Sequence, residues 1–218
     1  MPRTGTSWIR GAVVGRLLVP FYALAVLVLT PATARGSEGW SVTDPLAVGL
    51  AFLSNLAIHE SGHYLVAEGV GARDASLKFF SQDDGTFFLG LSTARDLPEE
   101  SSITYKLGGE IAVSYTFEFA LQNYRRGPTT YNAALLFFSG TDLFWYTVFA
   151  FYLAPEEDDR YDPVGIRKVT GFSRGTLLGA ASAQLAANAY RVWSGSDRVV
   201  PSFSYDRRSA LLNLTLQF

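Results

Sequence analysis

Two histidines stand four residues apart in His59-Glu60-Ser61-Gly62-His63, and they are the only histidines in the 218-residue sequence. On an α-helix, residues at this spacing lie on one face, so both imidazoles can reach the same metal ion. Glu60 would reach a water molecule on that ion and not the ion itself. Zinc lowers the pKa of such a water toward about 7, and a carboxylate can take its proton as the water attacks a carbonyl. The motif predicts a zinc site with His59 and His63 as ligands and Glu60 as general base.

A catalytic zinc site needs a third protein ligand. The chain has no cysteine and no further histidine, so this ligand must be a carboxylate, and three of them lie in apolar stretches downstream: Glu110, Glu118 and Asp142. Asp142 is the first candidate, because it is the sole charge in an aromatic stretch and closely follows Gly140. Glu118 is the second, because a downstream helical glutamate is the third ligand in soluble enzymes of the thermolysin type. Glu110 can instead pair with Lys106, one helical turn away.

The composition favours a membrane protein. Hydrophobic residues make up 48% of the chain and charged residues only 17%, against about 25% charged residues in ordinary soluble domains. The mean hydropathy of +0.14 requires that polar stretches accompany any apolar spans. A net charge of −2, without a basic stripe, gives no reason to expect a nucleic-acid partner.

The histidine motif belongs to the apolar stretch 44–67, which carries no charge between Asp44 and Glu60. Asp44 is a candidate N-cap, and Gly69 lies just beyond the end of the stretch, so the pattern predicts one helix long enough to cross a bilayer. Gly62 would keep this helix slender beside the metal and leave room for a substrate.

The remaining elements are predicted from apolar runs and turn signals. Two β-rich runs around Gly85 predict a hairpin over 75–94, and the alternating tail predicts a possible second hairpin over 199–218. The charged segment 155–163 is expected to be a loop. The apolar stretches 103–124, 132–153 and 176–193 predict three further helices, so the fold class is mainly α, a polytopic membrane helix bundle with hairpins.

Three segments are expected along the chain. Residues 1–34 combine three arginines with the apolar run 17–30 and the small residues Ala32-Thr33-Ala34. This pattern fits either a cleaved secretory signal or a first membrane helix, and both direct the chain to a membrane or beyond it. Residues 35–198 would form the membrane-embedded helical core, and residues 199–218 would form the C-terminal hairpin tail.

The motif and the order of its neighbours resemble the site-2 protease family of intramembrane zinc proteases, over roughly residues 44–155. The features that carry the resemblance are HESGHYLVAEGVGA on an apolar helix, the hairpin, the helix entered through PEESSITYKLGGE, and a later aspartate. The resemblance implies Zn²⁺ as cofactor, Asp142 as the third ligand, and a hairpin that helps to present an extended substrate. The sequence around Asp142, Gly-Thr-Asp-Leu, departs from the family's Pro-Leu-Asp-Gly pattern.

The expected function is zinc-dependent hydrolysis of peptide bonds in membrane-anchored proteins, within the lipid bilayer of a bacterial inner membrane. Two alternatives stay open. The chain can be a membrane protein that uses the same helix for metal binding or structure without proteolysis. It can also be a periplasmic peptidase similar to the gluzincins, with Glu118 or Glu110 as the third ligand.

Overall fold

The computed structural model describes residues 43–154, 157–206 and 210–217, so the expected secretory signal or first membrane helix over 1–34 lies outside the described residues. The chain is mainly helical with two antiparallel hairpins, which confirms this part of the sequence prediction. In chain order the elements are α2 (Thr43–Gly69), β1 (Arg73–Asp83), β2 (Thr86–Arg95), a 3₁₀ turn (Glu99–Ser101), α3 (Ser102–Lys106), α4 (Gly108–Arg126), α5 (Thr130–Val148), a π-helical turn (Phe149–Leu153), α6 (Asp162–Thr170), α7 (Arg174–Ser194), β3 (Val199–Tyr205) and β4 (Ala210–Leu216).

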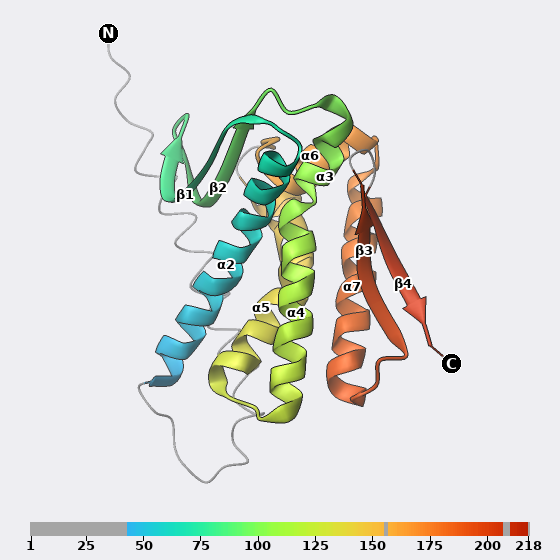
Figure 1. Cartoon of the computed structure of the whole chain (residues 1–218). Helices are drawn as coiled ribbons and strands as arrows, with labels where there is room; N and C mark the ends of the chain where they lie inside the picture. The colour runs from blue at the N-terminus through green and yellow to red at the C-terminus, as the bar shows by residue number, and fades with distance from the viewer. Residues whose placement is uncertain (1–42, 155–156, 207–209, 218) are drawn as a thin grey trace.

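Helices α2, α4 and α5 lie side by side and form the centre of the molecule (Figure 1). Their shared core includes Ala51, Leu121 and Leu135, one from each helix and all buried. Gly62 of α2 lies directly against Gly108 of α4, because a Cβ at position 62 would come within 2.7 Å of the Gly108 carbonyl carbon. Gly62 therefore allows two helices to touch, which corrects the expectation that it leaves room for a substrate.

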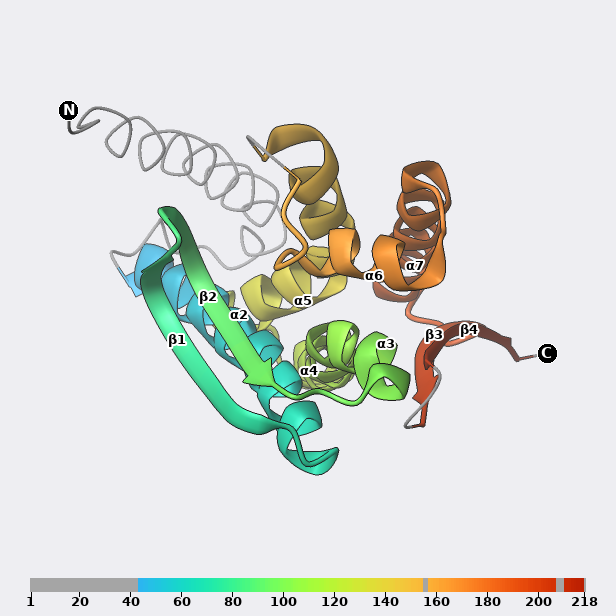
Figure 2. The same ribbon diagram turned by 90° about the horizontal axis from the view of Figure 1, so that it is seen from above.

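The predicted first hairpin is present, with β1 and β2 paired from Arg73 opposite Arg95 to Asp83 opposite Thr86. Its turn contains Gly85, whose φ of 77° lies in the left-handed region that glycine adopts without strain. Strand β2 runs across the upper part of α2, as the view from above shows (Figure 2). Its position places the strand directly over the histidine motif.

Helix α7 and the second hairpin close the other side of the bundle (Figure 1). The Arg191 side chain of α7 is buried and donates hydrogen bonds to Glu118 of α4 at 2.8 Å and to Asp197 at 2.8 Å. A buried guanidinium needs such carboxylate partners, so this cluster fixes α7 against α4. Strands β3 and β4 pair from Val199 opposite Leu216 to Tyr205 opposite Ala210, which confirms the predicted tail hairpin.

The segment that the sequence predicted as a charged loop ends in a short helix. Helix α6 begins at Asp162, with Pro163 in its first turn, a position where proline needs no amide hydrogen bond. The preceding loop is held by Arg160, which donates to Asp158 at 2.9 Å and to Asp83 of the hairpin at 2.5 Å. Lys106 of α3 donates to the Asp159 carbonyl at 2.7 Å. These contacts fix Asp162 beside the upper end of α2.

Among the helices that the structure describes, one is long and apolar enough to cross a membrane, the continuous stretch Thr130–Leu153 formed by α5 and the π-helical turn. Half of its most apolar window is buried inside the molecule. The several membrane-spanning helices expected from the sequence are therefore not supported by the described part of the chain, and a polytopic bundle stays a prediction.

Candidate metal centre

Three buried side chains bring their donor atoms together where α2 meets α6. The Nε2 atoms of His59 and His63 lie 3.2 Å apart. The Oδ2 atom of Asp162 lies 3.2 Å from Nε2 of His59 and 3.0 Å from Nε2 of His63. All three residues are more than nine-tenths buried. This group could hold a metal ion with one donor atom from each residue.

The second nitrogen of each imidazole determines which nitrogen carries the proton. Nδ1 of His63 lies 2.6 Å from the carbonyl oxygen of Tyr105, which can only accept, so this nitrogen donates. Nδ1 of His59 donates to Oδ2 of Asp142 at 2.9 Å, and the other oxygen of Asp142 accepts from Asn55 at 2.6 Å. In their neutral forms both imidazoles therefore present a bare Nε2 lone pair toward Asp162.

A metal ion fits this arrangement. Two Nε2 atoms and a carboxylate oxygen at 3.0–3.2 Å from one another need a cation among them, which is either a proton on an imidazole or a metal ion bound by all three. Tetrahedral zinc with metal–ligand distances of about 2.0–2.2 Å places its ligand atoms roughly 3.3 Å apart, close to these values. The backbone of α4 also leaves this space open at Gly109, because a Cβ there would lie 2.6 Å from Nε2 of His63. Two imidazoles and one carboxylate are a donor set that suits zinc.

The Asp162 carboxylate is suited to metal binding by its charge. Burial alone raises the pKa of this group. When no metal is bound, the protonated imidazoles of His63 and His59, which attract and donate to this carboxylate, outweigh burial. Together with the ammonium of Lys106, 3.9 Å from Oδ1, they hold the pKa of Asp162 well below its usual range. Asp162 is therefore a carboxylate across the neutral pH range, which is the form that ligates metals.

The sequence named Asp142 as the first candidate for the third ligand, but the structure places Asp162 beside the two Nε2 atoms. Asp142 lies instead against Nδ1 of His59, where a carboxylate orients the imidazole and raises its basicity. Glu118 accepts a hydrogen bond from Arg191 of α7 and does not contact the histidines. Glu110 is buried close to His59 and Asp142. These three residues form a second group that could hold a metal ion, because their donor atoms lie within 4.8 Å of one another.

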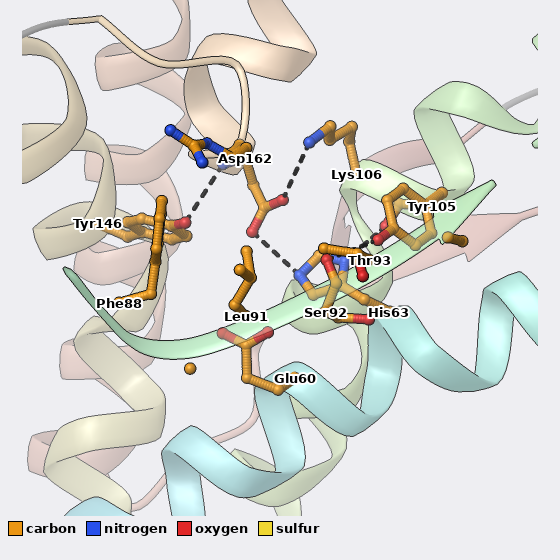
Figure 3. A pocket seen from close by; sticks show the side chains of 13 residues that line it. Glu60, His63, Phe88, Leu91, Ser92, Thr93, Tyr105, Lys106, Tyr146 and Asp162 are labelled. Atoms are coloured by element: carbon orange, nitrogen blue, oxygen red, sulfur yellow. Dashed lines mark hydrogen bonds and ion pairs between the residues drawn. The ribbon is translucent and has the colours of Figure 1, made fainter. Parts of the chain in front are cut away.

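A cavity of about 190 Å³ adjoins this centre, and Glu60 forms part of its wall together with His63 and Asp162. Glu60 comes from α2 and Asp162 from the start of α6, so the two carboxylates enter the cavity from opposite sides (Figure 3). Strand β2 passes directly over Glu60, because a Cβ at Gly90 would lie 2.6 Å from Oε1 of Glu60. Glycine at this position therefore allows the hairpin to cover the general-base candidate.

The rest of the lining comes from main chain and side chains of β2 and from four aromatic or basic side chains outside that strand: Tyr105, Lys106, Tyr146 and Arg160 (Figure 3). The arrangement thus combines a metal-binding set, a carboxylate base and a covered cavity. Those are the components of a metal-assisted hydrolase.

Comparison with known proteins adds nothing to this geometry: no protein-family model, curated protein or solved structure matches the chain. The assignment of a function therefore depends on the site itself.

Replacing Asp142 with asparagine is expected to weaken zinc binding by about 10–100-fold without abolishing it, since loss of a carboxylate partner behind a metal-bound histidine costs that much. The affinity can be measured by competition with a chromogenic zinc chelator. Asp159→Asn is the matched control, because the Asp159 side chain is more than half exposed and pairs with Lys168 and not with a histidine. Equal zinc affinity in the Asp142 variant and the wild type would show that the contact with His59 has no role in metal binding.

Proposed function

We propose that this protein is a zinc-dependent endopeptidase of the site-2 protease type, which hydrolyses peptide bonds of membrane-anchored proteins. The observation that carries the proposal is the convergence of His59, His63 and Asp162 on one point, with Glu60 in the wall of the same cavity. A helix with this motif, followed by a hairpin that covers it, is also the arrangement on which the resemblance to that family rests.

The residues of the site have distinct tasks in this reaction. His59, His63 and Asp162 would hold the zinc ion, which when bound polarises the substrate carbonyl and makes a water molecule more acidic. Glu60 accepts a proton from the water as the water oxygen bonds to the carbonyl carbon. It returns that proton to the nitrogen as the carbon–nitrogen bond breaks. The products are a new carboxyl end and a new amino end.

The surface of the helices supports a membrane setting. The apolar stretch Thr130–Leu153 satisfies the length and composition of one membrane span. Helix α2 also presents a row of leucines outward, and an exposed apolar face of this kind suits contact with lipid. The exposed leucines are Leu46, Leu50, Leu53 and Leu65. A substrate anchored in the same bilayer would reach the cavity from the side of the hairpin.

Removal of the metal tests the proposal. The full-length protein, purified in detergent, is incubated with solubilised single-span membrane proteins, and new chain ends are detected by mass spectrometry. We expect cleavage that stops when 1,10-phenanthroline removes the zinc and resumes when Zn²⁺ is restored, because the proposed reaction needs the bound ion to polarise the carbonyl and to acidify the water. Circular dichroism before and after chelation verifies that the helices persist.

Two results would count against the proposal. Cleavage that continues after the zinc is removed would exclude a metal-dependent reaction. A zinc-loaded, folded protein that cleaves none of these substrates would favour the alternative of a metal-binding membrane protein without proteolytic activity.

A further inference from the structure

Tyr146 of α5 stands in the cavity wall beside the candidate metal centre. Its ring packs edge-on against the His59 imidazole, with ring centres 5.6 Å apart. Its hydroxyl accepts a hydrogen bond from the backbone N–H of Asp162 at 3.4 Å. In Figure 3 the hydroxyl points from the wall toward Asp162. The phenol is thus held at the centre by two of the residues that would bind the metal.

The proton of this hydroxyl is not used elsewhere in the described part of the chain. The Asp162 N–H is itself a donor, so the phenol oxygen accepts there and its own proton stays available. Tyr105, the other tyrosine of the cavity, differs in this respect, because its hydroxyl donates to the carbonyl oxygen of Ser92 at 2.9 Å. Arg160, also in the wall, is paired with Asp158 and Asp83.

Peptide hydrolysis requires a donor of this kind. When water adds to the substrate carbonyl, negative charge develops on the carbonyl oxygen, and a donor fixed beside that oxygen stabilises the transition state more than the ground state. The hydrogen bond from Asp162 fixes the phenol and polarises its O–H group, which makes it a better donor. The low exposure of the site strengthens the interaction, since water competes weakly there.

We propose that Tyr146 is a catalytic residue whose hydroxyl donates a hydrogen bond to the oxygen of the scissile carbonyl as that oxygen becomes negatively charged. The assignment rests on the proposed endopeptidase function. It adds a residue from α5 to a centre otherwise formed by α2 and α6.

The test compares Tyr146→Phe with Tyr161→Phe in zinc-loaded, full-length protein. Tyr161 is a suitable control, because it is a buried tyrosine whose ring centre lies 6.4 Å from that of Tyr146 but which does not line the cavity. For Tyr146→Phe we expect kcat to fall about 10²–10³-fold with KM little changed, as for loss of one oxyanion donor. Tyr161→Phe should retain the wild-type kcat.

Binding measurements separate this role from a structural one. A phosphinic peptide carries a tetrahedral, negatively charged centre like that of the transition state, whereas a hydroxamate binds zinc without that geometry. Tyr146→Phe should lose affinity for the phosphinic peptide by a factor similar to its loss in kcat. Its affinity for the hydroxamate and its zinc content should equal those of the wild type.

The outcomes are distinct. Wild-type kcat and phosphinic-peptide affinity in Tyr146→Phe would overturn the assignment and leave the endopeptidase function intact, provided that the wild type cleaves and Glu60→Gln does not. Parallel loss of zinc and of hydroxamate binding would also overturn it, because Tyr146 would then only support the metal centre. A wild-type protein that holds zinc but cleaves nothing would overturn both the assignment and the proposed function.

Discussion

Replacing Glu60 with glutamine is expected to lower the rate of substrate cleavage by about 10²–10⁴-fold while the protein keeps its zinc, which is the range that a general base contributes. Glutamine has the shape of glutamate, so it still fits beneath Gly90, where a carboxylate oxygen lies 2.6 Å from the position of a Cβ. An amide cannot accept the proton of the attacking water, so the reaction loses its base. Cleavage is followed by gel or mass spectrometry, and zinc by elemental analysis.

Glu68→Gln provides a matched control for this variant. Glu68 lies on the same helix α2, beyond the histidine motif, and its side chain is exposed. The same substitution there should change neither cleavage nor zinc content. A Glu60→Gln protein that cleaves at the wild-type rate would rule out Glu60 as the base, and one that loses its zinc would show that Glu60 supports the metal instead.

Replacing Asp162 with alanine is expected to remove zinc binding. The variant should lose affinity by more than the roughly 100-fold upper range for a residue that only orients a ligand. The physical reason is that Oδ2 of Asp162 lies within 3.2 Å of both Nε2 atoms, where it can share one ion with them. Alanine has no atom that could replace this ligand. Zinc content of the purified protein and competition with a chelator measure the effect. Cleavage should be lost together with the metal.

Asp159→Ala is the control for this experiment. Asp159 belongs to the same acidic loop, but its side chain is more than half exposed and pairs with Lys168 at 2.7 Å. Its backbone carbonyl, which accepts from Lys106, is unaffected by the substitution. The Asp159 variant should therefore bind zinc normally. Zinc retained by Asp162→Ala but lost by Asp142→Ala would restore the ligand assignment that the sequence favoured.

The elements with strong local patterns were predictable from the sequence. The apolar stretch 44–67 corresponds to α2, Thr43–Gly69, because its apolar run and flanking signals are local. The first hairpin is also as predicted, since two β-rich runs flank a turn that contains Gly85. The stretch 103–124 instead forms α3 and α4, joined at Leu107.

The third candidate ligand was not predicted, because its position depends on tertiary structure. Asp162 stands in PEEDDRYDP, a run whose charge and two prolines are typical of a loop. Its burial results from contacts with α3 and the hairpin through Lys106 and Arg160, which no local pattern encodes. One signal was present: the Asp-Pro pair at 162–163 is a common beginning of a helix, and α6 does begin there.

The prediction of Asp142 as a metal ligand has a different physical background. Its isolation in an aromatic stretch correctly marked it as a residue with a special environment, since a lone buried carboxylate needs a partner. The sequence could not indicate which face of His59 it meets. In the structure it contacts Nδ1, and Asn55, one helical turn before His59, holds its other oxygen. The sequence therefore indicated that this carboxylate has a role, but it did not indicate which ring nitrogen of His59 the carboxylate contacts.

The distance along the chain between His59 and Asp162 has a consequence for biosynthesis. The two residues are 103 positions apart, and between them lie the hairpin, α3, α4 and α5. While the ribosome is still adding these elements, the nascent chain already contains the complete histidine motif but lacks the carboxylate that closes the metal site. Under the proposed function, tight zinc binding and the hydrolysis that depends on it would therefore begin only after α6 has emerged and docked. A protease built in this way would be inactive toward neighbouring chains until its own bundle is assembled.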